Sequence, residues 1–178
     1  MKYFQLRNGQ TLMIRKAKIE DASRIIDYIN KVCKETENLT FGEGEFGITA
    51  DKEAEFIEAV SKSENQLMIC AYIEEKLVGQ LVFAGGHRPR IMHTGEFSIT
   101  VLKEYWGLEI GTEFIKYLIN WAKETRIIRK INLKVRSDNN RAVKLYKSLN
   151  FVFEGTISRE FFINGKFYDS IHMGIEID

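Results

Sequence analysis

The stretch EYWGLEIG, residues 104–111, lies between a segment that predicts a β-strand and a segment that predicts an α-helix. The preceding segment EFSITV, residues 96–101, alternates polar and apolar side chains, whereas residues 110–125 repeat apolar side chains at helical spacing. A loop in this position can turn the unpaired N–H groups of the helix start toward one point, where they bind a phosphate without any lysine. Gly107 and Gly111 allow the sharp turn that this requires.

The glycine spacing excludes two common nucleotide-binding motifs. No Gly-Lys-Ser/Thr follows, so the loop is not a P-loop, and a dinucleotide-binding fingerprint would have to open the fold and precede an acid at the next strand end. Because turns generally contain glycine, an ordinary strand-to-helix turn stays open. The other reading is a loop whose backbone amides bind a phosphorylated ligand of another kind.

The composition indicates one domain over residues 1–178. Hydrophobic residues make up 44% of the chain and charged residues 29%, as in ordinary globular proteins. The 26 basic and 25 acidic side chains leave a net charge of +1, which gives no reason to expect nucleic acid or an anionic membrane as a partner. We expect a cytoplasmic protein, because residues 1–10 contain no apolar signal-peptide segment and no apolar run reaches membrane-spanning length.

The two cysteines predict no special chemistry. Cys33 and Cys70 stand outside any metal-binding or redox spacing. We expect both to be reduced core residues, and we expect no metal site.

The remaining segments predict elements in the order ββ-α-α-βββ-α-β-α-ββ. Asn8-Gly9 predicts a type I′ hairpin and Asn164-Gly165 another tight hairpin. Two amphipathic helices, within residues 20–35 and 51–63, are separated by the glycine-bearing loop 40–49. Later helices cross over between strands. We therefore expect an α/β (α+β) fold with a mixed, mostly antiparallel central sheet and helices on both faces.

A second motif lies in the segment NNRAVKLYKSLNF. Its residues are Asn139, Ala142, Leu145, Tyr146, Asn150 and Phe151. With the loop before it, this segment resembles the GNAT superfamily of acyl-CoA N-acyltransferases. That family pairs Arg/Gln-x-x-Gly-x-Gly/Ala with a later Asn-x-x-Ala-x-x-Leu-Tyr-x-x-x-Gly-Phe. The order of elements is also similar, so the resemblance covers most of the chain. Here Asn150 replaces the second motif's glycine, while in the loop Trp106 stands at the Arg/Gln position and Glu109 at the first glycine.

The resemblance implies acetyl-CoA as co-substrate, without a metal. Main-chain groups of the strand before the loop would hold the pantetheine arm, with an N–H near Val101 available to the thioester oxygen. From the residues alone, these positions could equally be plain core strand. The implied cofactor-binding residues are Ile99, Thr100, Val101, Gly107, Leu108, Glu109, Ile110, Gly111, Thr112, Asn139 and Tyr146.

Glu109 is the main departure within the loop, because it would bring a carboxylate close to a pyrophosphate. We expect an ordinary helical-start backbone there, since a left-handed one costs a non-glycine residue about 1–2 kcal/mol. We also expect weaker cofactor binding than in relatives that carry the motif arginine.

Tyr146 is the predicted general acid, as the matching family tyrosine implies. A phenol with an ordinary pKa of about 10 is a proton donor at neutral pH. Without the resemblance, Tyr146 could be a core tyrosine with a satisfied hydroxyl, and Asn139 only a helix N-cap. Glu96 is the predicted general base, because an acid on a central strand should be either paired or functional. A water relay could replace it, and His93 is a weaker candidate.

The amine acceptor is expected where the loop 40–49 meets the terminal hairpin. Glu43 and Glu45 could attract a cationic amine, or they could form only a solvated acidic loop. Aromatic side chains that could wall the pocket are Phe41, Phe46, Phe162, Phe167 and Tyr168.

The implied function is an acetyl-CoA-dependent N-acetyltransferase. It would move the acetyl group to a primary amine of a small molecule or protein N-terminus by direct attack in a ternary complex. The alternative is a catalytically silent CoA-binding sensor or interaction module. The aromatic terminal hairpin could also serve a homodimer interface.

Overall fold

Eight strands and four α-helices follow one another in the expected order. The computed structural model describes residues 1–178. Two 3-10 turns, η1 (Ile19–Asp21) and η2 (Lys103–Tyr105), precede α1 and follow β5. The elements are β1 (Lys2–Gln5), β2 (Thr11–Lys16), α1 (Ala22–Glu35), α2 (Ala50–Lys62), β3 (Gln66–Ile73), β4 (Lys76–Gly85), β5 (Thr94–Val101), α3 (Ile110–Thr125), β6 (Lys130–Arg136), α4 (Asn140–Ser148), β7 (Val152–Ile163) and β8 (Lys166–Glu176).

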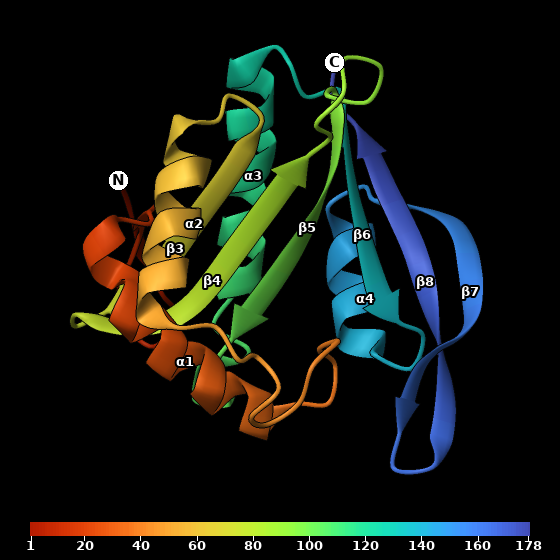
Figure 1. Ribbon diagram of the computed structural model, residues 1–178, viewed down its shortest axis with the longest axis horizontal. Helices are drawn as coiled ribbons and strands as arrows, with labels where there is room; N and C mark the ends of the chain where they lie inside the picture. Colours follow the sequence, from red (N-terminus) through yellow and green to blue (C-terminus); the bar gives the residue numbers. More distant parts are fainter.

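The strands form one sheet in the order β1-β2-β3-β4-β5-β6-β8-β7 (Figure 1). Every neighbouring pair is antiparallel except β5 and β6, which are parallel and joined by the crossover helix α3. The β5–β6 pairing covers only three residue pairs and ends at Glu96 and Asn132. Beyond that pair the two strands diverge, and Figure 1 shows the separation widening toward their C-terminal ends.

Helices cover both faces of the sheet, as expected for this fold class (Figure 1). On one face, α1 and α2 enclose a core with Met68, Cys70 and Tyr72 of β3. On the other face, α3 and α4 pack on a larger core that includes Phe83 and Leu133. Apolar residues alternate between these two cores along β3, which is why the whole strand is buried. No helix is long and apolar enough to cross a lipid bilayer.

The two Asn-Gly turns differ. Asn164 and Gly165 both have positive φ, 51° and 78°, which a type I′ turn requires. In the first hairpin only Gly9 has positive φ, so the expected type I′ turn there is wrong. Asn8 Oδ1 instead accepts a hydrogen bond from the Gln10 N–H at 3.1 Å, a side-chain turn that asparagine favours. Strand pairing stops at Gln5 and Thr11, and the turn includes the buried Leu6.

Candidate active site

A cavity of about 1010 Å³ lies where β5 and β6 separate. It is lined on one side by residues 96–101 of β5 and on the other by residues 134–136 of β6. The loop before α3 and the N-terminal turn of α4 border it, and so do α1, α2 and the loop that connects them. The cavity therefore extends from the start of α3 to the sheet face that α1 and α2 cover.

The separation of the strands leaves main-chain groups of β5 without a partner strand. Successive residues of a strand direct their N–H and C=O groups to opposite neighbours. Because Leu102 N donates to the Val78 carbonyl of β4 and Thr100 pairs with Gln80, the groups of Ile99 and Val101 point away from β4. The Val101 carbonyl accepts a hydrogen bond of 2.7 Å from Trp106 Nε1. The Ile99 and Val101 N–H groups remain available, and buried backbone donors normally find a partner.

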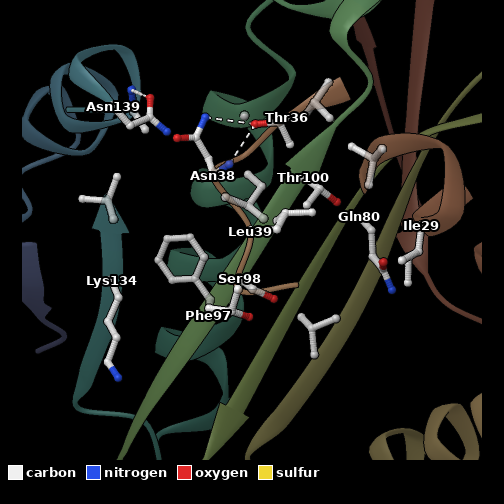
Figure 2. Close-up of a pocket in the computed structure, with 18 of the residues that line it drawn as sticks. Ile29, Thr36, Asn38, Leu39, Gln80, Phe97, Ser98, Thr100, Lys134 and Asn139 are labelled. Carbon is white, nitrogen blue, oxygen red and sulfur yellow. Dashed lines mark hydrogen bonds between the residues drawn. The ribbon is translucent and has the colours of Figure 1, made fainter. Parts of the chain in front are cut away.

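Thr100 occupies a different position from its two neighbours. Its main chain pairs with β4, and its Oγ1 accepts a hydrogen bond of 2.9 Å from the hydroxyl of Tyr28 in α1. Figure 2 shows Ser98 and Thr100 projecting from β5 on the opposite side from Phe97. Burial raises the pKa of Tyr28, so its hydroxyl stays a donor. Thr100 lines the cavity, but both its main chain and its hydroxyl already have partners.

The loop before α3 presents a row of free amides. None of the backbone N–H groups from Gly107 to Thr112 donates a hydrogen bond within the protein. Positive φ at Gly107 (87°) and Glu109 (64°) alternates with negative φ at Leu108. Backbone of alternating handedness turns successive N–H groups toward one side and forms an anion-binding concavity. With the positive end of the α3 dipole behind it, this loop can bind a phosphate group.

The expected helical-start conformation of Glu109 is wrong. This residue is the left-handed N-cap of α3, with φ 64° and ψ 12°. The backbone turns sharply just before α3, and a left-handed residue completes this turn. The left-handed conformation costs a residue other than glycine about 1–2 kcal/mol. Its carboxylate forms an ion pair with Arg7 of the first hairpin. The charge that would oppose a pyrophosphate is therefore compensated.

Arg141 places a positive charge beside the residue that replaces the motif arginine. Its guanidinium lies 5.0 Å from the ring centroid of Trp106, and both residues line the cavity. Arg141 forms no ion pair with a protein carboxylate. Its cation is therefore available at this end of the cavity.

Asn139 and Tyr146 both reach the cavity from α4. Asn139 caps this helix, because its Oδ1 accepts a hydrogen bond of 3.2 Å from Ala142 N, while its side-chain amide forms no bond within the protein. Tyr146 is 6% exposed and packs edge-on against Phe97 at 5.9 Å between centroids. Its hydroxyl has no hydrogen-bond partner in the protein, unlike that of a satisfied core tyrosine. Burial raises the pKa of Tyr146, which keeps the phenol protonated.

Glu96 lies where the pairing of β5 with β6 ends, and it lines the cavity. It is exposed and forms no ion pair or hydrogen bond through its side chain. Its carboxylate is therefore accessible from the cavity. His93 is not brought to the cavity; its carbonyl accepts hydrogen bonds from the N–H groups of Arg129 and Lys130.

The loop between α1 and α2 does meet the terminal hairpin. The Glu37 carbonyl accepts a hydrogen bond of 3.0 Å from Arg136, and its carboxylate accepts one from Asn164 Nδ2. Phe41 and Phe46 pack on each other and line the cavity, as expected. The acidic residues of the loop do not line it: Glu43 pairs with Lys34, and Glu45 accepts the N–H of Gly42.

The terminal hairpin contributes different residues from those expected. Phe162 and Phe167 pack on each other with centroids 4.7 Å apart, and neither they nor Tyr168 line the cavity. Instead, Glu160 and Phe161 line it. A shift in register between Ile157 and Phe161 breaks the alternation of β7, which changes the side chains that face the site.

Two further buried polar residues line the cavity and were not expected from the sequence. Glu53 of α2 is 3% exposed and Gln80 of β4 is 6% exposed, and neither side chain forms a hydrogen bond within the protein. A signal for Glu53 was present: it occupies the same helical stripe as the buried Ile57 and Val60. A carboxylate on an apolar stripe needs a partner or a function.

Comparisons with known proteins all point to one family. Residues 33–151 match the model of the Acetyltransferase (GNAT) family. The spermidine N(1)-acetyltransferase of Escherichia coli K12 is 34% identical over 80 residues, which are 45% of this chain and 43% of that protein. The L-amino acid N-acetyltransferase AaaT of the same strain is 30% identical over 108 residues, 61% of this chain and 65% of that protein. The chain thus spans less than two thirds of the length of each of these two curated relatives.

A solved structure covers more of the chain. The crystal structure of an acetyltransferase of the GNAT family from Streptococcus pneumoniae superposes with a TM-score of 0.91 at 30% sequence identity. The match covers 94% of this chain and 99% of that one.

Proposed function

This chain belongs to the GNAT family of acetyltransferases, and we propose that it transfers an acetyl group from acetyl-CoA to a primary amine. The observation that carries the proposal is the gap between β5 and β6, into which unpaired main-chain donors and the free hydroxyl of Tyr146 face. Residues 1–178 would act as one N-acetyltransferase domain. The free, buried Cys33 and Cys70 fit the reducing cytoplasm.

The donors around the gap suit the parts of acetyl-CoA. The amides from Gly107 to Thr112 would hold the pyrophosphate, with the free side-chain amide of Asn139 and the guanidinium of Arg141 close to the same end. The Ile99 and Val101 N–H groups would bind the pantetheine arm and the thioester oxygen, as an added strand would. Acetyl-CoA supplies the chemistry of a thioester, an acyl group activated toward amines.

The side chains at the gap supply the two proton transfers of the reaction. A nitrogen–carbon bond to the amine forms while the carbon–sulfur bond breaks, so the amine loses a proton and the sulfur gains one. Glu96, directly or through water, accepts the proton of the amine. The protonated phenol of Tyr146 donates to the departing sulfur and is reloaded from solvent. Attack is direct in a ternary complex, so no covalent enzyme intermediate forms.

A small-molecule amine is the favoured acceptor. The names of the two curated relatives give spermidine and L-amino acids as their substrates, which supports a small primary amine for this chain as well. The loop between α1 and α2 borders the acceptor side of the cavity with Phe41 and Phe46. No observation favours the catalytically silent alternative.

Two measurements on the purified protein test the proposal. Thermal unfolding with and without acetyl-CoA tests binding, and release of free thiol across a panel of amines tests turnover. We expect acetyl-CoA to raise the Tm and at least one amine to release thiol. Binding without thiol release from any amine would replace the proposal with the silent binding module, and absence of binding would contradict both.

A further inference from the structure

A carboxylate without a partner lies inside the cavity, away from the reaction site. Glu53 of α2 is 3% exposed, lines the cavity, and forms neither an ion pair nor a side-chain hydrogen bond. Burial raises the pKa of Glu53, and no neighbouring cation counteracts this effect. A buried charge of this kind is costly unless something pairs with it. The protein supplies no partner, so the carboxylate is open to a cationic group of a ligand in the cavity.

Glu53 sits over β3 rather than over β5. Its helix packs on β3, with Ile57 and Val60 in one apolar cluster with Cys70. Burial raises the pKa of the Cys70 thiol to about 12, and the nearby negative charges of Asp21 and Glu53 act in the same direction. Glu53 is buried on the same face of α2 as Ile57 and Val60, and this face covers β3.

This position separates Glu53 from the point of acetyl transfer. Cys70 pairs with Gln80 of β4, and Gln80 pairs with Thr100 of β5. Neighbouring strands are about 4.8 Å apart, so β3, on which α2 packs, lies roughly 10 Å from β5 across the sheet. A carboxylate on a helix over β3 is therefore offset from an amine that lies at β5. It can hold a different group of the same acceptor.

The space between the two points is mainly apolar. Gln80 lies on the side of β5 that carries Ser98 and Thr100, as Figure 2 shows together with Ile29. Gln80 is the buried polar residue between Glu53 and β5, and its free amide can accept or donate a hydrogen bond. The apolar residues that line this side are Ile29, Val32, Phe56 and Val82.

We propose that Glu53 binds a second ammonium group of the acceptor, so that the preferred substrates are diamines or longer polyamines with an aliphatic chain between their amino groups. One amino group lies at β5 and accepts the acetyl group. The aliphatic part of the substrate lies along the apolar residues of the cavity, and its second ammonium group pairs with Glu53. This inference rests on the proposed function, because it concerns the acceptor of the same site.

Binding titrations test the inference independently of catalysis. Calorimetry compares hexamethylenediamine with hexylamine, which has the same chain and one ammonium fewer. A charge-assisted hydrogen bond contributes about 1.5–3 kcal/mol, so we expect the diamine to bind the wild-type protein tenfold more tightly or better. In Glu53→Gln the ratio of the two Kd values should fall to about one. The control Glu55→Gln, on the exposed side of the same helix, should keep the wild-type ratio.

Two results would overturn the inference: equal wild-type affinity for both amines, or a preference for the diamine that survives Glu53→Gln. Glutamine removes the buried charge at nearly constant volume, so far-UV circular dichroism should show a folded variant. Thiol release with the same two amines is recorded in parallel. Diamine binding that depends on Glu53 without any thiol release would contradict the proposed function and leave this inference standing. Thiol release without a Glu53-dependent preference for the diamine would support the proposed function and overturn this inference.

Discussion

Arg7 in the turn between β1 and β2 forms an ion pair with Glu109 at the start of α3. The pair joins segments 102 residues apart in the chain. Both side chains are largely exposed, so the pair itself adds at most about 1 kcal/mol to stability. The position of the pair matters more than its strength. Residues 107–112 carry the free backbone amides, and Glu109 has the only carboxylate among these residues.

Removal of Arg7 should weaken acetyl-CoA binding. In Arg7→Ala the carboxylate of Glu109 loses its partner beside the proposed pyrophosphate site, and we expect the Kd for acetyl-CoA to rise about two- to fivefold. Glu109→Gly should lower the Kd, and Arg7→Ala should then have no further effect in that background. Calorimetric titration gives the Kd for acetyl-CoA of the wild type, the two single variants and the double variant. Arg24→Ala, which removes an exposed arginine from α1, is the control for net charge; an equal effect of both arginines would refute the local explanation.

Tyr146→Phe should reduce turnover without loss of structure. The ring keeps its packing against Phe97 and Phe151, and the lost hydroxyl has no hydrogen-bond partner in the protein. General acid catalysis is typically worth a factor of about 10²–10⁴, so we expect kcat to fall at least a hundredfold. The Kd for acetyl-CoA should change by less than about twofold. Steady-state kinetics beside Tyr117→Phe of α3 checks this, and an unchanged kcat would remove Tyr146 from the reaction.

Thr100 should matter for stability rather than for the cofactor. Thr100→Val leaves the buried hydroxyl of Tyr28 without its acceptor, which we expect to lower the free energy of unfolding by about 1–3 kcal/mol. Tyr28→Phe combined with Thr100→Val should recover most of this loss, because neither polar group then stays unpaired. Urea unfolding of the wild type, both single variants and the double variant measures the coupling. Additive losses would show that the hydrogen bond is not the cause.

The buried pair of Arg15 and Asp21 should make stability depend on pH. Arg15 donates two hydrogen bonds, of 2.6 and 2.8 Å, to Asp21. Burial alone would raise the pKa of Asp21, but these bonds and one from the Lys18 N–H outweigh it and lower the pKa below its ordinary 3.8. A lowered pKa in the folded state stabilises the protein above the unfolded value, and this stability is lost as pH falls through the folded value.

Asp21→Asn should therefore lower the free energy of unfolding at pH 7 by about 3–5 kcal/mol, as for other broken buried pairs. The difference from the wild type should shrink only below pH 3.8, when Asp21 takes up its proton. Urea unfolding at several pH values measures it, with the exposed Asp27→Asn of α1 as control. A difference that is constant down to the acid limit would contradict the assignment.

Much of the fold could be predicted because its signals are local. The apolar stripe of residues 110–125 matches the bounds of α3, and Asn164-Gly165 has the two positive φ values that its turn requires. Asn139 and Tyr146 were recognised through a motif that lies within one helix and its cap. These features depend on residues close in sequence, which a single sequence shows.

The features that were missed depend on contacts between distant segments. The left-handed Glu109 is accompanied by Arg7 from the first hairpin, which no local pattern in EYWGLEIG reveals. Because of the register shift in β7, Phe161 lines the cavity and Phe162 does not. The sequence alone does not distinguish between these two adjacent phenylalanines. The helical stripe of α2 shows that Glu53 is buried, but only the packing of α2 on β3 shows that its carboxylate faces the cavity without a partner.

Acetyl transfer by this protein is tested most directly by mass spectrometry of the amine after incubation with acetyl-CoA and the purified protein. We expect a product heavier by one acetyl group on a primary amine, formed with the wild type and lost in large part with Tyr146→Phe. A protein that binds acetyl-CoA but acetylates none of the diamines, monoamines and amino acids offered would contradict it.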